Sequence, residues 1–272
     1  MVDVISEHIT FPSGGAEIKA YLARPESGGR FPALILIHEI WGVNQNIEDI
    51  ARRFASQGYI ALAPDLYSRS GIPVSKEDIA RAMAFIQALP LTGRAGPNFM
   101  QEEMAKLPES DRLVMEKTMQ WLMHRDYAQN IEDLKAALSW LNASQFVDTK
   151  RIASLGFCMG GTLSGRLAGT GAALAASIIF YGESVPDDQI AKIGCPVLGM
   201  YGGEDHRITD TVPQFDRRMK ESGKSFTYKI YPGAYHAFFN DSNPKTYNSV
   251  AASDAWTTVL GFLSSNLSNK AK

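Results

Sequence analysis

The sequence has 272 residues, of which 45% are hydrophobic and 21% are charged, with 27 basic side chains against 29 acidic ones. A chain of this length buries about three quarters of its unfolded surface in one core, so neither metals nor disulfides are needed to fold it. The net charge of −2 excludes the strongly basic surface that binds nucleic acid or anionic lipid.

Three further features of the sequence bear on where the protein resides. The longest apolar run, 172–181, has about half of the length that a bilayer span needs. Asp3 and Glu7 precede any apolar stretch, so the N-terminus does not resemble a secretory signal. The two cysteines, Cys158 and Cys195, do not form a disulfide framework. We therefore expect a cytoplasmic protein, a monomer or homodimer that binds neither nucleic acid nor membranes.

The predicted elements begin with a hairpin and continue as strands that alternate with helices. The segments 5–11 and 17–23 flank the turn-forming cluster 12–15. Apolar runs typical of buried strands lie at 33–37, 59–63, 151–157, 176–181, 196–201 and 226–231. Helices are predicted after Asn46 and Asn130 as N-caps, from about residue 159, over 213–222 and near the C-terminus. This alternation indicates an α/β protein with a mostly parallel, twisted sheet covered by helices on both faces.

One stretch breaks this alternation. No strand is predicted in 64–130, which instead holds two amphipathic helices on either side of an irregular segment, 93–99. An excursion of this length usually forms a functional cap or lid rather than a structureless loop. We therefore expect a helical cap insertion at about 72–125 within a single domain of residues 1–272. The alternative is a helical insertion that only thickens the fold.

The sharpest chemical signal is the segment Gly156-Phe157-Cys158-Met159-Gly160, which follows a strand and opens a helix. The pattern G-x-C-x-G is the nucleophile elbow with cysteine in place of serine. The nucleophile sits on a tight turn, so the residues two before and two after it must be small. The N-terminus of a helix also favours an anion such as a thiolate. The alternative is that Cys158 is a small buried hydrophobic residue, the role that we assign to Cys195.

A base and an orienting acid follow at the strand ends where this motif needs them. Asp205 comes 47 residues after Cys158, directly beyond the strand 196–201, and His236 comes 31 residues later, just past the strand 226–231. Nucleophile, acid and histidine follow one another in this order in enzymes with the elbow. An imidazole takes the thiol proton, and a carboxylate fixes its tautomer. The competing residues are Glu204 and Asp210 as the acid and His206 as the base.

The segment that follows the first buried strand, His38-Glu39-Ile40-Trp41-Gly42, supplies further candidates. The zinc motif H-E-x-x-H would need histidine in place of Gly42, and we predict no metal and no cofactor. The backbone N–H groups of Ile40 and Met159 are the expected oxyanion hole. The Glu39 side chain is expected near Cys158, either as a second proton acceptor or as a structural ion-pair partner.

Together these motifs resemble the dienelactone hydrolase family of the α/β-hydrolase superfamily. The matching segments are 38–44, 63–69, 156–161, 202–206 and 236–238. The resemblance covers about residues 15–265, apart from the insertion. It implies an α/β-hydrolase fold and a carboxymethylenebutenolidase-like enzyme that cleaves small carboxylic esters or lactones through the Cys-His-Asp triad and an acyl-thioester. It also implies that Glu39 holds the thiol and takes its proton once substrate arrives, and that Arg69 binds a substrate carboxylate.

One departure from the family affects the expected substrate. Where its lactone hydrolases carry a second carboxylate-binding arginine, shortly after the catalytic histidine, this sequence has Asn240, and the same arginine would have paired with Glu39. Losing a bidentate donor changes which anionic substrates can be held. The alternative functions are a catalytically inactive binding protein on the same scaffold, a thiol redox enzyme that uses Cys158, and a transferase that passes the acyl group to another acceptor.

Overall fold

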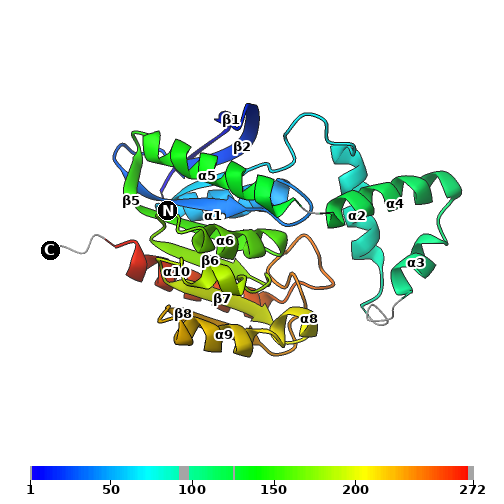
Figure 1. The fold of residues 1–272 in the computed structure, drawn as a ribbon. Coiled ribbons are helices and arrows are strands. Elements are labelled where there is room, and N and C mark those ends of the chain that lie inside the picture. The colour runs from blue at the N-terminus through cyan, green and yellow to red at the C-terminus, as the bar shows by residue number, and fades with distance from the viewer. Residues whose placement is uncertain (1, 92–97, 125, 269–272) are drawn as a thin grey trace. The chain divides into compact units, whose positions relative to one another are not determined.

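The computed structural model, which describes residues 2–91, 98–124 and 126–268, contains an eight-stranded sheet in the order β1-β2-β4-β3-β5-β6-β7-β8 (Figure 1). The strands are β1 (Val4–Ser13), β2 (Ala16–Pro25), β3 (Phe31–Ile37), β4 (Ile60–Pro64), β5 (Val147–Phe157), β6 (Ala176–Phe180), β7 (Val197–Gly202) and β8 (Phe226–Tyr231). The pairs β1–β2 and β2–β4 are antiparallel, and all other pairs are parallel. The predicted, mostly parallel sheet is therefore confirmed.

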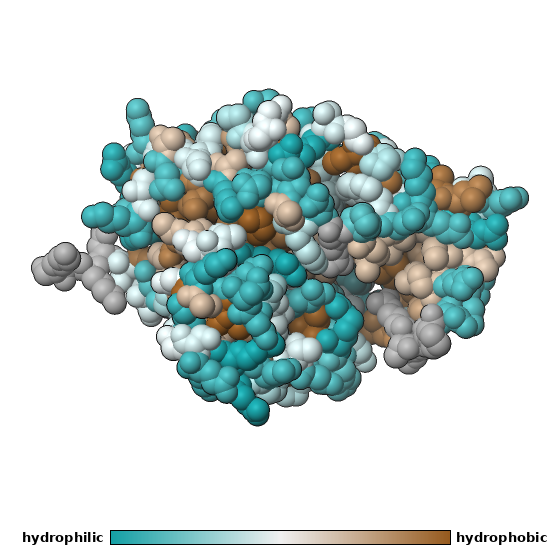
Figure 2. Space-filling view, in the orientation of Figure 1, coloured by the Kyte–Doolittle hydropathy of each residue, from teal (hydrophilic) through white to brown (hydrophobic). Residues whose placement is uncertain are grey.

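Helices cover both faces of this sheet. They are α1 (Gln45–Ser56), α5 (Tyr127–Ala143), α6 (Met159–Gly169), α7 (Asp187–Ile190), α8 (His206–Thr209), α9 (Val212–Glu221) and α10 (Ser249–Asn266). Because side chains alternate along a strand, Ile35 and Ile37 of β3 pack in one core with α5, α6, α7 and α9, whereas Leu34 and Leu36 pack in the other with α1 and α10. The face of the molecule drawn in Figure 2 carries mostly hydrophilic residues, with hydrophobic residues in small patches.

The carboxyl ends of the six parallel strands, β3 to β8, meet at one edge of the sheet. The register pairs Ile37 with Gly156 and Phe157 with Phe180, and Phe180 in turn with Met200. Beyond this edge the chain continues into the segments that sequence analysis singled out after β3, β5, β7 and β8. In open α/β sheets, ligands bind outside the carboxyl ends of the strands.

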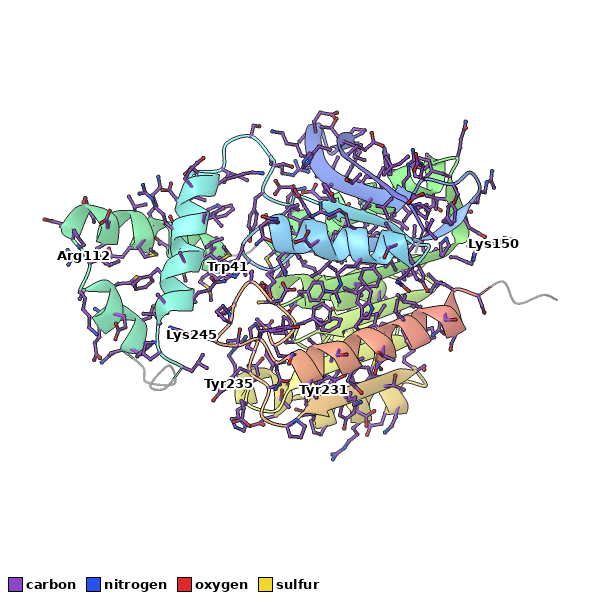
Figure 3. All side chains as sticks on the ribbon, turned by 180° about the vertical axis from the view of Figure 1, so that it is seen from behind. Trp41, Arg112, Lys150, Tyr231, Tyr235 and Lys245 are labelled. Atoms are coloured by element: carbon purple, nitrogen blue, oxygen red, sulfur yellow. The ribbon has the colours of Figure 1, made fainter. Side chains whose placement is uncertain are left out.

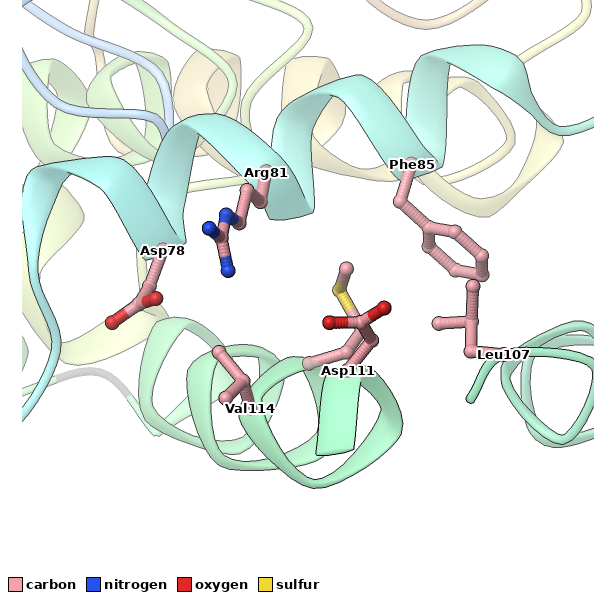
Figure 4. A pocket seen from close by; sticks show the side chains of 7 residues that line it. Asp78, Arg81, Phe85, Leu107, Asp111 and Val114 are labelled. Carbon is pink, nitrogen blue, oxygen red and sulfur yellow. The ribbon is translucent and has the colours of Figure 1, made fainter. Parts of the chain in front are cut away.

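The insertion forms a second compact unit, Arg69–Asp126. Its helices are α2 (Lys76–Ala88), α3 (Phe99–Met104) and α4 (Glu109–Met123). A pocket of about 410 Å³ lies within this unit (Figure 4). It is lined by Asp78, Arg81, Phe85, Leu107, Asp111, Val114 and Met115. The pocket contains none of the predicted catalytic residues, and the role of the unit as a cap stays a prediction.

Two helix starts were predicted wrongly. Helix α1 is capped by Asn44, whose side chain accepts from the N–H of Ile47 at 3.2 Å, whereas Asn46 donates to Asp241 instead. Helix α5 begins at Tyr127, so Asn130 lies within its first turn.

The predicted hairpin is confirmed, with both turn glycines in the left-handed region. The insertion also holds α3, which was not predicted, and residues 93–97 of the expected irregular segment lie outside the described residues.

None of the helices described here combines the length and the apolar composition needed to cross a bilayer.

Candidate active site

Cys158 occupies a sharp turn between β5 and α6. Its backbone lies at φ 54° and ψ −115°, a conformation that residues other than glycine rarely adopt. Its N–H donates to the carbonyl oxygen of Phe180 at 3.0 Å, which ties the turn to the neighbouring strand. Strain of this kind persists only where the surrounding structure imposes it, and it is common at active sites.

Two glycines allow this turn to form. A Cβ atom at Gly156 would lie 2.0 Å from the carbonyl oxygen of Gly160, and one at Gly160 would lie 2.2 Å from that of Ile37. No side chain fits at either position without moving backbone. The strand, the helix and the end of β3 therefore approach each other as closely as the elbow motif requires.

Asp205 and His236 meet after β7 and β8, as the sequence predicted. Oδ2 of Asp205 lies 2.5 Å from Nδ1 of His236, and the carboxylate is buried whereas the imidazole is 32% exposed. Tyr231, the last residue of β8 before the loop that carries His236, lies beside α10 (Figure 3). Its hydroxyl donates to Asp254 of that helix at 2.8 Å. The loop thus starts from a fixed strand end.

The imidazole of His236 also interacts with Cys158. Burial alone would lower the pKa of His236, but the charge of Cys158 and hydrogen bonds with Asp205 and Cys158 raise it to about 10. A histidine with this pKa is protonated at neutral pH. The arrangement therefore favours an imidazolium that pairs with the carboxylate of Asp205 on one side and faces Cys158 on the other.

Glu39 follows β3 and is buried. Its Oε2 accepts from Nδ2 of Asn240 at 2.8 Å, and its Oε1 accepts from the hydroxyl of Tyr181 at 3.3 Å. Burial raises the pKa of Glu39 and outweighs the opposing effects of Asn240, His236 and Tyr181. Asn240 is therefore the partner of Glu39 that the resemblance had left unidentified.

Tyr181 is the residue of this site that the sequence analysis missed. It follows β6 with φ 38°, and its buried ring packs edge-to-face on His236 with 5.0 Å between ring centroids. Its hydroxyl reaches Glu39, so one side chain contacts two candidate residues. The sequence did contain a signal for Tyr181. This residue ends the strand next to the one that carries Cys158, and the other candidates were found because each of them follows the end of a strand.

The two predicted oxyanion donors are available for a ligand. Met159 is the first residue of α6, and the first N–H groups of a helix have no partner within it. Ile40 lies in the loop after β3. Within residues 2–91, 98–124 and 126–268, neither N–H group donates to a protein acceptor. The N–H of Cys158, in contrast, is already bound to Phe180.

The competing residues Glu204, His206 and Asp210 are exposed to solvent. His206 pairs with Asp210 at 3.3 Å, both largely exposed, and Glu204 is exposed. Cys195 is buried just before β7, at the opposite end of the parallel strands from the Cys158 turn, and burial raises its pKa to about 11. Arg69 is the first residue of the second unit, whereas the other candidates belong to the first unit. No group of three metal-ligating side chains occurs among the residues described.

Comparisons with known proteins give a consistent result. A model of the dienelactone hydrolase family matches residues 18–267. A Saccharolobus solfataricus protein named "Putative carboxymethylenebutenolidase" is 41% identical over 260 residues, which are 95% of this chain and 98% of that protein. An Escherichia coli protein of the same name is 30% identical and covers 94% of this chain, with 86% of its own length matched.

A solved structure agrees with these relatives. The crystal structure of a Klebsiella pneumoniae protein described as a "Putative Dienelactone Hydrolase" has a TM-score of 0.72 and 29% identity, and the match covers 96% of this chain and 99% of that one. The chain therefore belongs to the dienelactone hydrolase family and is a hydrolase of that type with the α/β-hydrolase fold.

Proposed function

We propose that the chain hydrolyses carboxylic esters or lactones through a Cys158–His236–Asp205 triad and an acyl-thioester intermediate. The observation that carries the proposal is the imidazole of His236, which pairs with Asp205 at 2.5 Å and lies close enough to Cys158 at the elbow for that residue to raise its pKa. A nucleophile, a base within reach of it and an acid that orients the base form the arrangement that nucleophilic catalysis needs.

Acylation begins with the sulfur of Cys158. Sγ attacks the carbonyl carbon, and the carbonyl oxygen becomes an oxyanion that the N–H groups of Ile40 and Met159 stabilise. When the C–O bond to the leaving group breaks, the imidazolium of His236 gives its proton to the departing oxygen. An ester releases an alcohol, whereas an opened lactone keeps its new hydroxyl end, and in both cases the acyl group stays on sulfur as a thioester.

Deacylation uses the same groups in reverse. The sulfur of the thioester carries no charge, so the contribution of Cys158 that raises the pKa of His236 is lost. The neutral imidazole then takes a proton from water as the water oxygen attacks the thioester carbon. The C–S bond breaks, the carboxylic acid is released, and the thiolate and the imidazolium are restored.

The chemistry of the leaving group decides the preferred substrate. A thiolate leaves a tetrahedral intermediate more easily than an alkoxide or an amine does, so ordinary esters and amides return to starting material. Enol esters and lactones, whose own leaving groups are good, react best. Arg69 is proposed, on the family resemblance, to bind a carboxylate of such a substrate, and the unit that begins with it is proposed to be the cap.

Glu39 is proposed to accept a proton from the thiol whenever Cys158 is protonated. Its hydrogen-bond partners Asn240 and Tyr181 are both neutral, and burial disfavours its charge. A carboxylate in such surroundings gains a proton readily. This chemistry agrees with the role that the resemblance implies better than a permanent ion pair does.

Replacing Asn240 with leucine is expected to move the acid limb of the kcat/KM profile to higher pH. The substitution removes the donor at 2.8 Å from the charged form of Glu39, so the pKa of Glu39 rises. We expect kcat/KM near pH 7 to fall roughly 10- to 100-fold, the usual cost of losing a hydrogen bond to a buried charge. Tyr181→Phe is the companion variant, with a smaller shift because its bond is 3.3 Å long. Unchanged profiles in both variants would rule out Glu39 as a proton acceptor.

Mass spectrometry of the quenched reaction tests the proposed function as a whole. The protein is mixed with p-nitrophenyl acetate, enol esters and lactones, quenched in acid and weighed intact before peptide mapping. We expect one acyl group on the peptide that contains Cys158, most abundant with the best leaving groups, and the same adduct in a Cys195→Ala variant. Turnover with an adduct on another residue, or with none in Cys158-containing peptides at any quench time, would refute the thioester mechanism.

A further inference from the structure

His38 is fully buried and uses both of its ring nitrogens, although the proposed mechanism gives it no task. Nε2 lies 3.2 Å from the backbone N–H of Leu66, and Nδ1 lies 2.5 Å from the backbone carbonyl oxygen of Glu39. An amide N–H can only donate, so Nε2 accepts, and the ring proton is on Nδ1. His38 therefore donates to the carbonyl oxygen of Glu39 in one fixed tautomer.

This hydrogen bond fixes the orientation of the next peptide N–H. The carbonyl of Glu39 and the N–H of Ile40 belong to the same planar trans peptide, so they point in opposite directions. The same carbonyl also accepts from the N–H of Gly42 at 3.3 Å. Two donors on one side of the peptide thus hold the Ile40 N–H on the other side, where no protein acceptor among the described residues meets it.

Tyr67 supports the same loop. Its ring packs edge-to-face on His38 with 5.0 Å between ring centroids, and a Cβ atom at Gly42 would lie 3.3 Å from that ring. Its hydroxyl donates to the sulfur of Met159 at 3.6 Å. The segment that follows β4 therefore contacts Met159 and, through His38 and Gly42, the loop that contains Ile40. This gives a physical role to Leu66 and Tyr67 in the 63–69 segment, of which the mechanism had used only Arg69.

We infer that His38, supported by Leu66 and Tyr67, is a positioning residue that orients the Glu39–Ile40 peptide so that the Ile40 N–H stabilises the oxyanion. The inference rests on the proposed function, because the oxyanion forms only if Cys158 attacks a carbonyl. His38 itself does not touch the substrate. Its effect is confined to reactions that pass through an oxyanion.

Two reactions of the same sulfur test this inference. Acylation of Cys158 by p-nitrophenyl acetate forms an oxyanion, whereas alkylation by iodoacetamide substitutes at a saturated carbon and forms none. In His38→Leu, which lacks the donor, we expect the single-turnover acylation rate to fall roughly 10²- to 10³-fold, the usual cost of one oxyanion donor. The alkylation rate should stay within about twofold of wild type, because alkylation forms no oxyanion for the Ile40 N–H to stabilise.

The conservative variant is His38→Asn, whose amide nitrogen can replace Nδ1 as donor to Glu39. We expect it to recover acylation about tenfold relative to His38→Leu, since the peptide is again held from the same side. If His38→Leu does not fold, as shown by circular dichroism, the comparison of His38→Asn with wild type decides, with slower acylation and unchanged alkylation expected.

The possible failures are distinguishable. If acylation and alkylation fell together, His38 would maintain the nucleophile or the fold. If acylation did not fall, the peptide would need no support from His38. Either result overturns the inference about His38 and leaves the proposed function standing. Wild-type protein that is alkylated but never acylated at Cys158 would instead refute the proposed function, and the inference with it.

Discussion

Replacing Cys158 with alanine is expected to lower hydrolysis of p-nitrophenyl acetate by about 10⁶-fold, or about 8 kcal/mol of transition-state stabilisation. The loss is this large because the variant has no atom that can form the thioester, and His236 and Asp205 then have no nucleophile to activate. The measurement is the steady-state rate at saturating substrate, with the uncatalysed rate subtracted.

Two further variants make this result specific. Cys195→Ala removes the other thiol of the chain, which is buried before β7, and should keep kcat within about twofold because that sulfur lies outside the site. Cys158→Ser should remain weak, since the imidazolium pair that the site favours depends on charge at sulfur, which a hydroxyl does not readily carry. Turnover close to wild type in Cys158→Ala would assign catalysis to another residue.

The sequence predicted the parts of this site that depend on local geometry and on strand order. The turn at Cys158 needs glycine at 156 and 160, and that requirement is visible as a motif. Asp205 and His236 were found because each follows a strand, and parallel strands end at a common edge. The structure brings these two residues together, whereas the exposed side chain of the competing His206 pairs with Asp210.

The parts that the sequence did not predict depend on which side chains meet across long separations. Asn240 and Glu39 are 201 residues apart, and nothing near either residue encodes their hydrogen bond. The prediction of the α1 cap was wrong for a related reason, because Asn44 and Asn46 are equally good N-cap residues by type. The choice between them follows from tertiary structure, since the side chain of Asn46 is bound to Asp241.

Replacing Asp205 with asparagine is expected to lower kcat by roughly 10³- to 10⁴-fold, the range seen when a triad carboxylate is made neutral. An amide cannot hold His236 in the required tautomer, and it cannot stabilise the imidazolium. The pKa of His236, about 10 in the intact site, should fall, because Asp205 is one of the groups that raise it. Titration of the imidazole by NMR measures this fall directly, without reference to activity.

Glu204→Gln is the matched control, because it removes the same charge one residue earlier, from an exposed side chain. We expect this variant to keep kcat within about twofold and to leave the His236 titration unchanged, since solvent screens an exposed charge. If both variants behaved alike, the contact at 2.5 Å between Asp205 and His236 would be incidental. If only Asp205→Asn lowered both kcat and the pKa, the carboxylate would be acting through the imidazole, because a purely structural defect would not select that one titration.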